Sequence, residues 1–245
     1  DLAAIETEPF TQWVIEDNFP SGRPDWEAAG ALFVDEVAPY EQMKLRMLNG
    51  AHSMLAYSGF LSGHRYVRDT MGDPELRRLI ERHLKAAAET LEPLPGIDFS
   101  AYAQELSERF TNPSIAHETY QIAMDGSQKL PQRILEPALA ALQSGQSVRP
   151  FAFATAAWMR YCLGRTDAGE PYALRDPLEE QIAECLATAE TSAEIFSGMT
   201  SLRGVFPKAL IAAPEWRGEV IGVLSSILEI GVAAAIRAEA ATSLH

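Results

Sequence analysis

Three polar side chains in residues 41–53 have the types and the spacing that proton transfer requires. Lys44, Asn49 and His52 stand in an otherwise core-forming helical segment. On a uniform α-helix with Lys44 at zero, Asn49 lies at about 140° and His52 at about 80°, so the three share one side. A lysine can act as base or acid at a hydroxyl or carbonyl, an amide can stabilise the developing oxyanion, and an imidazole can hold a neighbouring hydroxyl.

This chemistry needs a lysine that is partly neutral near pH 7–8. Lowering the pKa of a lysine from about 10.4 by three units costs about 4 kcal/mol, which burial can supply. We therefore expect Lys44 to be desolvated at the mouth of a groove. Gly50, which costs about 1 kcal/mol against alanine inside a helix, indicates close approach of another backbone or of a ligand. The alternative is structural: Lys44 and Arg46 extend to solvent, and the other two side chains satisfy buried backbone groups.

The elements that must position these residues are mostly helical. After Pro39 the sequence is rich in Ala, Leu and Glu, and apolar residues recur every three and four positions. Asp73 followed by Pro74 predicts the N-cap and first position of one helix. Helices are expected at residues 39–59, from 74 onward, and at about 98–110, 115–125, 128–143, 150–162, 177–188, 191–203 and 214–239.

The first 40 residues have a different pattern. Short apolar runs at 2–5, 12–15 and 32–34 predict two or three strands, with a turn at 18–22 between the second and the third. The expected fold is therefore a mainly all-α domain of about nine or ten helices with a small β edge. Residues 1–38 form a β-containing link, and residues 39–245 form the helical domain.

Composition limits the class of function. The 245 residues include 20 Lys and Arg against 34 Asp and Glu, and the resulting net charge of −14 disfavours nucleic acid as a partner. No apolar run reaches the roughly 20 residues that span a membrane. Cys162 and Cys185 stand too far apart for a disulfide framework or a thiolate zinc site, which favours a reducing cytoplasm. The chain begins with Asp1 rather than Met, so we expect a piece of a longer protein.

Several cofactor signatures are absent from the sequence. The 16 glycines include no Gly-x-Gly spacing and no Gly-Lys pair, so both the dinucleotide loop and the P-loop are excluded. His117 and Glu118 begin like a zincin helix, but Gln121 stands where the second histidine would be. Three earlier histidines are too far apart to form a ligand pair within one helix. No metal site is therefore expected.

Five separated motifs resemble the long-chain mannitol dehydrogenase family, in the same order. They are EPFTQWVIED at 8–17, FVDEVAPY at 33–40, EQMKLRMLNGAHS at 41–53, NPSI at 112–115 and DGSQKLPQR at 125–133. Members of this family oxidise polyols and sugar acids with a nicotinamide cofactor. The resemblance implies the C-terminal half of such an enzyme, with a fold like the 6-phosphogluconate dehydrogenase C-terminal domain. The N-terminal Rossmann half, which holds most of the NAD, is missing from the sequence.

The resemblance also implies roles for particular residues. The family's general base falls on Lys44, its oxyanion-stabilising amide on Asn49, its substrate-orienting imidazole on His52, and a glutamate on the proton path on Glu41. A second asparagine of the oxyanion hole belongs to the missing half. The isolated chain is therefore not expected to bind NAD detectably, and its first 40 residues are expected to pack against the missing half.

Substrate choice follows from the same resemblance. Lys129 matches a substrate-contacting lysine of the family, but this chain has Gln121 where mannitol-type enzymes usually carry Arg. The run at 119–133 is more similar to the members that act on mannonate and fructuronate, so Lys129 and Arg133 would offer charge to a sugar carboxylate. One alternative is a mannitol or arabinitol dehydrogenase. Another is a helical module that binds a partner without catalysis.

Overall fold

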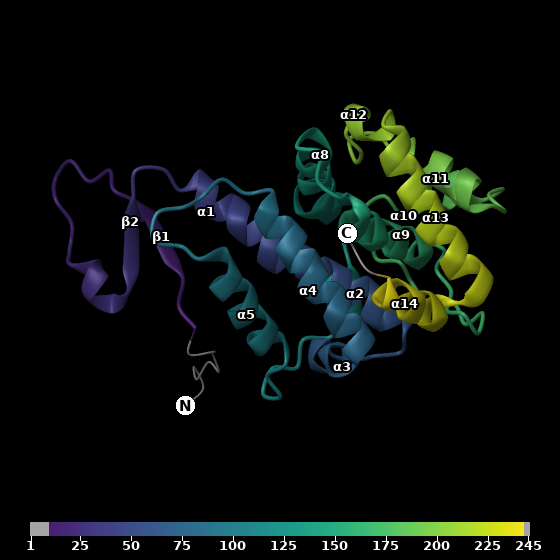
Figure 1. Cartoon of the computed structure of the whole chain (residues 1–245), viewed down its shortest axis with the longest axis horizontal. Coiled ribbons are helices and arrows are strands. Elements are labelled where there is room, and N and C mark those ends of the chain that lie inside the picture. The colour runs from purple at the N-terminus through teal and green to yellow at the C-terminus, as the bar shows by residue number, and fades with distance from the viewer. Residues whose placement is uncertain (1–9, 243–245) are drawn as a thin grey trace.

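Helices form most of the structure, a computed structural model that describes residues 10–242 (Figure 1). This confirms the predicted mainly all-α class. The helices begin with η1 (Trp26–Ala29), α1 (Ala38–Met43), η2 (Lys44–Asn49), α2 (Gly50–Leu61), α3 (Val67–Gly72), α4 (Pro74–Glu89), α5 (Phe99–Phe110), α6 (Thr119–Ala123) and α7 (Gly126–Leu130). They continue with η3 (Pro131–Leu135), α8 (Glu136–Gln143), α9 (Arg149–Tyr161), α10 (Glu179–Leu186), α11 (Ser192–Thr200), α12 (Lys208–Ile211), α13 (Pro214–Ile230) and α14 (Val232–Ala241). Across residues 10–242, no helix combines the length and the apolar composition of a membrane-spanning segment.

A short parallel sheet lies at one end of the molecule, beside the start of α1 (Figure 1). Strand β1 (Trp13–Glu16) pairs in parallel with β2 (Ala31–Val34). The strands predicted at 12–15 and 32–34 are therefore confirmed. The strand expected at 2–5 lies outside the described residues.

Helix α2 lies inside the helical body, where it packs against α4, α6 and α9. Its residues 53–59 are all buried. In α9 every residue from Pro150 to Tyr161 is buried, and small alanines between the large side chains allow close contact with α13. Full burial of one large apolar side chain contributes about 2 kcal/mol to folding stability. The buried residues 53–59 therefore hold the C-terminal turns of α2 firmly against the neighbouring helices. The first turn of α2 and the helical turn before it, which carry the candidate site, therefore extend from a rigid core.

The prediction of a single helix at 214–239 is wrong, because the helix is interrupted at Gly231, between α13 and α14. Gly231 has a φ of 80°, a conformation that is easily adopted only by glycine. The Asp167 carboxylate then accepts a hydrogen bond of 2.8 Å from the backbone N–H of Val232 at the start of α14. The helix predicted at 115–125 is also shorter than expected, since only α6 (Thr119–Ala123) is helical there.

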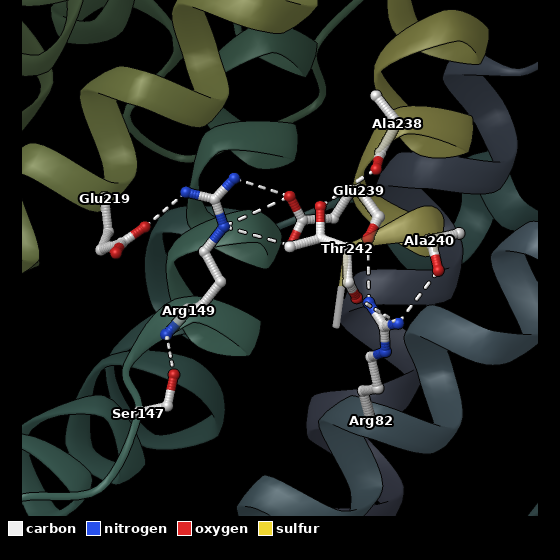
Figure 2. Close-up of polar contacts among 8 residues, drawn as sticks. All are labelled: Arg82, Ser147, Arg149, Glu219, Ala238, Glu239, Ala240 and Thr242. Carbon is white, nitrogen blue, oxygen red and sulfur yellow. Dashed lines mark hydrogen bonds and ion pairs between the residues drawn. The ribbon is translucent and has the colours of Figure 1, made fainter. Parts of the chain in front are cut away.

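Arginines hold the last helix against the body (Figure 2). Arg149 on α9 pairs with Glu239 of α14, with 2.6 Å between Nη2 and Oε2, and also with Glu219 of α13. Arg82 on α4 donates to the carbonyls of Glu239, Ala240 and Thr242 at 2.9, 2.9 and 2.7 Å, where α14 ends. Cations are favoured at a helix C-terminus, so Arg82 stabilises the end of α14. Arg149 stabilises the docking of the same helix through its ion pair with Glu239.

Candidate active site

The segment with the predicted catalytic residues contains one widened turn. Helices α1 and α2 are continuous through η2, a π-helical turn at Lys44–Asn49. The Gly50 N–H donates to the carbonyl of Leu45, five residues earlier. The uniform α-helix expected at 39–59 is therefore wrong at this turn. Because π-helical bonds join residues five apart, Lys44 and Asn49 lie on successive turns, closer in direction than the about 140° of an α-helix.

The predicted desolvation of Lys44 is wrong for this chain. The Lys44 side chain is exposed, as is Glu41 one turn earlier, whereas Asn49 and His52 are half-buried. Among residues 10–242, nothing pairs with the Lys44 ammonium or covers it. The low dielectric that a lysine base requires would have to come from a partner segment or from bound ligands.

His52 forms one wall of a small pocket. Its ring centroid lies 4.7 Å from that of Phe110 and 6.0 Å from that of His117, the latter nearly perpendicular. The pocket measures about 50 Å³ and is lined by Leu48, His52, Val67, Arg109, Phe110, Ile115 and His117. Packing of this kind fixes the direction of the imidazole, as an orienting role requires. The nearness of His117 could not be predicted from the sequence, because a loop brings it back to α2.

The Asp125–Gly126 pair sets the position of α7. Asp125 has a φ of 57°, and the chain turns there into the helix. A Cβ on Gly126 would lie 2.3 Å from Nε1 of Trp158 and 2.7 Å from the Tyr57 hydroxyl, so only glycine fits. Helix α7 therefore packs directly on α2 and α9. This contact places Lys129 on α7 and Arg133 on the following turn beside α2.

Lys129 and Arg133 differ in how their charge is used. Lys129 Nζ donates to the carbonyls of Met124 at 2.6 Å and Ile122 at 3.2 Å, at the end of α6. Burial, together with the nearby charge of Arg133, lowers the pKa of Lys129 below its ordinary value. Arg133 Nη1 lies 3.4 Å from the Ser53 hydroxyl, and its buried Nε has no partner among the described residues. Arg133 therefore reaches α2 next to His52 with donors to spare.

Gly50 confirms the predicted close approach of another backbone. A Cβ at this position would lie 2.9 Å from the carbonyl oxygen of Arg133 and 3.1 Å from Nε2 of His83. Arg133 belongs to η3, which is itself π-helical. Two π turns therefore meet at Gly50, one with Lys44 and Asn49 and the other with Arg133. Such turns occur frequently at functional sites.

Gln121 and Arg46 lie differently from what the sequence predicts. Gln121 is exposed on α6, and no contact among the described residues joins it to the other predicted site residues. Arg46 does not extend to solvent, because its side chain is buried and donates to Thr90 at the end of α4.

Within residues 10–242, no three His, Cys, Asp or Glu side chains gather as a metal site requires.

Buried His83 predicts a pH dependence of stability. Complete burial lowers its pKa from 6.5 to about 4, and the Pro150 carbonyl offsets only part of this. Below pH 6.5 the unfolded chain therefore binds a proton that the folded chain excludes until about pH 4, so stability falls over this interval by about 3 kcal/mol. Urea unfolding of His83→Gln should show a correspondingly smaller loss between pH 7 and 4.5. An equal loss in both proteins would contradict this assignment.

The chain has clear relatives among known proteins. Residues 36–214 match the family model of the mannitol dehydrogenase C-terminal domain. The D-mannonate oxidoreductase of Escherichia coli (strain K12) is 44% identical over 232 residues, which are 94% of this chain and 48% of that protein. A mannitol 2-dehydrogenase of Aspergillus fumigatus is 35% identical over 236 residues, which are 95% of this chain and 46% of that protein.

A solved structure shares the fold. It is the mannitol 2-dehydrogenase of Pseudomonas fluorescens in a ternary complex with NAD and D-mannitol, similar with a TM-score of 0.86 at 34% identity. The match covers 95% of this chain and 47% of that one. The chain thus spans about half the length of the relatives it matches. On both sequence and structure, this chain belongs to the mannitol dehydrogenase family and corresponds to its C-terminal domain.

Proposed function

We propose that this chain is the proton-transferring and substrate-binding part of an NAD-dependent oxidoreductase that interconverts mannonate and fructuronate. The observation that carries this proposal is the π turn, which brings Lys44 and Asn49 onto successive turns at the exposed edge of a rigid core. His52 follows on the next turn. The names of the relatives support a sugar acid or a polyol as the substrate, and NAD as the cofactor.

The proposed mechanism assigns one proton and one developing charge to this chain. When oxidation begins, Lys44 accepts the proton of the substrate hydroxyl through Nζ. The Asn49 amide donates to the oxygen as negative charge develops there, and the imidazole of His52 orients the substrate. Glu41 would pass the proton on to solvent, a role supported by its exposure three residues before Lys44. The cofactor supplies the acceptor for the hydride.

NAD would be held mainly by a second half of the enzyme. This chain offers no glycine loop for the pyrophosphate, but its exposed Lys44 edge remains open toward such a partner. The parallel pair β1–β2 also supports a second half. A two-stranded sheet is only marginally stable alone, and parallel sheets are normally covered by other elements. Trp13 and Leu32 on these strands are 47% and 41% exposed. We propose that residues 1–38 are the link that packs against that half.

The compartment that fits this proposal is a reducing cytoplasm. Cys162 and Cys185 are both free thiols in the fold. Cytosolic proteins normally keep their cysteines reduced.

Arg133 favours a sugar acid over an uncharged polyol. Its guanidinium is half-buried beside α2, and Nε has no partner within residues 10–242. A half-buried guanidinium with an unused donor is well suited to a carboxylate, and a charged hydrogen bond contributes about 1.5–3 kcal/mol. Lys129 is the weaker candidate, because its ammonium already binds two carbonyls.

The experiment compares mannonate with mannitol in the intact enzyme. We expect faster initial rates on mannonate. Arg133→Gln should raise KM for mannonate about 10- to 100-fold and leave KM for mannitol nearly unchanged, since only the acid loses a charged contact. Arg175→Gln, which removes an arginine that stacks on Tyr120, serves as the control. Equal effects of Arg133→Gln on both substrates would exclude a carboxylate contact.

A further inference from the structure

Arg46 anchors the π turn to a distant helix end. Its side chain is only 8% exposed, although it stands two residues after the exposed Lys44. Nη1 donates to the carbonyl of Thr90 at 2.6 Å and to the Thr90 hydroxyl at 3.0 Å. Thr90 is the C-cap of α4, and its hydroxyl also donates to the Ala87 carbonyl at 2.7 Å. The guanidinium therefore binds the negative end of a helix dipole.

Arg46 keeps its positive charge although its side chain is buried. Burial lowers the pKa of Arg46, and the negative charge of Glu136 at the start of α8 opposes this shift. An arginine stays charged under both influences, because its ordinary pKa lies far above neutral pH. Its buried Nε has no partner among residues 10–242, so within that range Thr90 accepts both of the hydrogen bonds that the guanidinium donates.

Two different elements, α4 and η3, hold the two ends of the π turn. Arg46 ties its first half to α4, and Gly50 just after it lies against the carbonyl of Arg133 in η3. A π turn is rarely stable by itself, so it persists where tertiary contacts require it. If the turn relaxed to α-helical geometry, Asn49 would rotate away from Lys44.

We propose that Arg46 is a positioning residue that keeps Lys44 and Asn49 aligned by holding the π turn against the C-terminal carbonyl of α4. This inference rests on the proposed roles of Lys44 and Asn49. Arg46 itself touches neither substrate nor cofactor. Its effect is on the angle between the base and the oxyanion donor, which must be correct to within about 10–20°.

The test uses the intact enzyme with Arg46→Met, Arg46→Lys and Thr90→Ala. A misplacement of about 1 Å costs about 100-fold, so Arg46→Met should lower kcat by about that factor, with KM for NAD unchanged. The primary deuterium isotope effect on kcat should rise, because the chemical step becomes limiting. Arg46→Lys, which keeps one donor for the Thr90 carbonyl, should recover most of the rate. Thr90→Ala, a milder change that retains the carbonyl, should give an intermediate rate.

Arg82→Met provides the matched control. Arg82 also donates to carbonyls at a helix end, but its partners are Glu239 and Ala240 at the end of α14 and not the end of α4 (Figure 2). It should lower Tm while kcat measured well below Tm stays within about twofold. The proposal is wrong if Arg46→Met keeps a normal kcat and isotope effect, or if the loss of kcat follows the loss of Tm equally in both variants. The proposed role of Lys44 fails separately if Lys44→Ala retains its turnover, and that of Asn49 fails if Asn49→Leu transfers hydride at the normal rate.

Discussion

Replacing Lys44 with alanine in the intact enzyme should lower kcat by about 10³- to 10⁴-fold. General acid–base catalysis contributes typically 10²–10⁴-fold, and the upper part of this range applies where no other base is near. Among the described residues, Glu41 is the only other candidate proposed for the proton path, and its carboxylate lies one turn away. KM for NAD should change little, because the proposed function leaves the cofactor mainly to a second half of the enzyme.

The measurement is a steady-state rate together with a cofactor titration of the same variant. Lys85→Ala is the matched control, since Lys85 is an 80% exposed lysine on α4 that pairs with Glu89. It should leave both quantities unchanged. A rate for Lys44→Ala near that of the unmodified enzyme would remove the lysine from the mechanism.

Replacing Asn49 with leucine should lower kcat by about 10²- to 10³-fold. Loss of one donor to a developing oxyanion has an effect of this size in other active sites. Leucine keeps the branching of this half-buried side chain at Cγ but lacks its polar atoms, so the π turn should persist. Asn49→Asp should be at least as slow, because a carboxylate repels the charge that develops on the substrate oxygen.

Single-turnover hydride transfer, followed by nicotinamide absorbance, separates this effect from product release. Both Asn49 variants should slow the transfer itself. A change confined to KM for the substrate, with an unchanged transfer rate, would make Asn49 a binding residue instead of an oxyanion donor.

Local sequence signals predicted much of the fold. Asp73 caps α4 as expected, since its Oδ1 accepts from the N–H groups of Glu75 and Leu76 at 2.9 and 3.1 Å. Both strands within the described residues were also predicted. The break at Gly231 was missed because apolar residues continue across it, and only the positive φ reveals that two helices meet there.

The candidate site was harder to predict, for two physical reasons. The π turn covers only six residues, Lys44–Asn49, and the apolar residues before and after it still recur at α-helical spacing. The sequence pattern therefore does not reveal the turn. The contacts that hold it are also remote in sequence, since Arg46 and Thr90 are 44 positions apart, and Arg133 and Ser53 are 80 apart. Gly50 was informative because a glycine inside a buried helix has a cost that only a close contact explains.

The exposure of Lys44 shows a further limit of the sequence. A catalytic pKa depends on everything that surrounds the amine, including groups supplied from outside this chain. The residue type and its spacing suggest the role, but among residues 10–242 the Lys44 side chain is exposed.

Chemical rescue of Lys44→Ala is the most direct test of the central claim. Small primary amines would be added to the intact variant with saturating NAD and mannonate, and the initial rate measured against amine concentration and pH. If Lys44 is the base, the rate should rise with amine concentration and should depend on the unprotonated fraction of the amine. If no amine raises the rate at any pH, although the variant binds NAD and mannonate normally, Lys44 is not the proton acceptor.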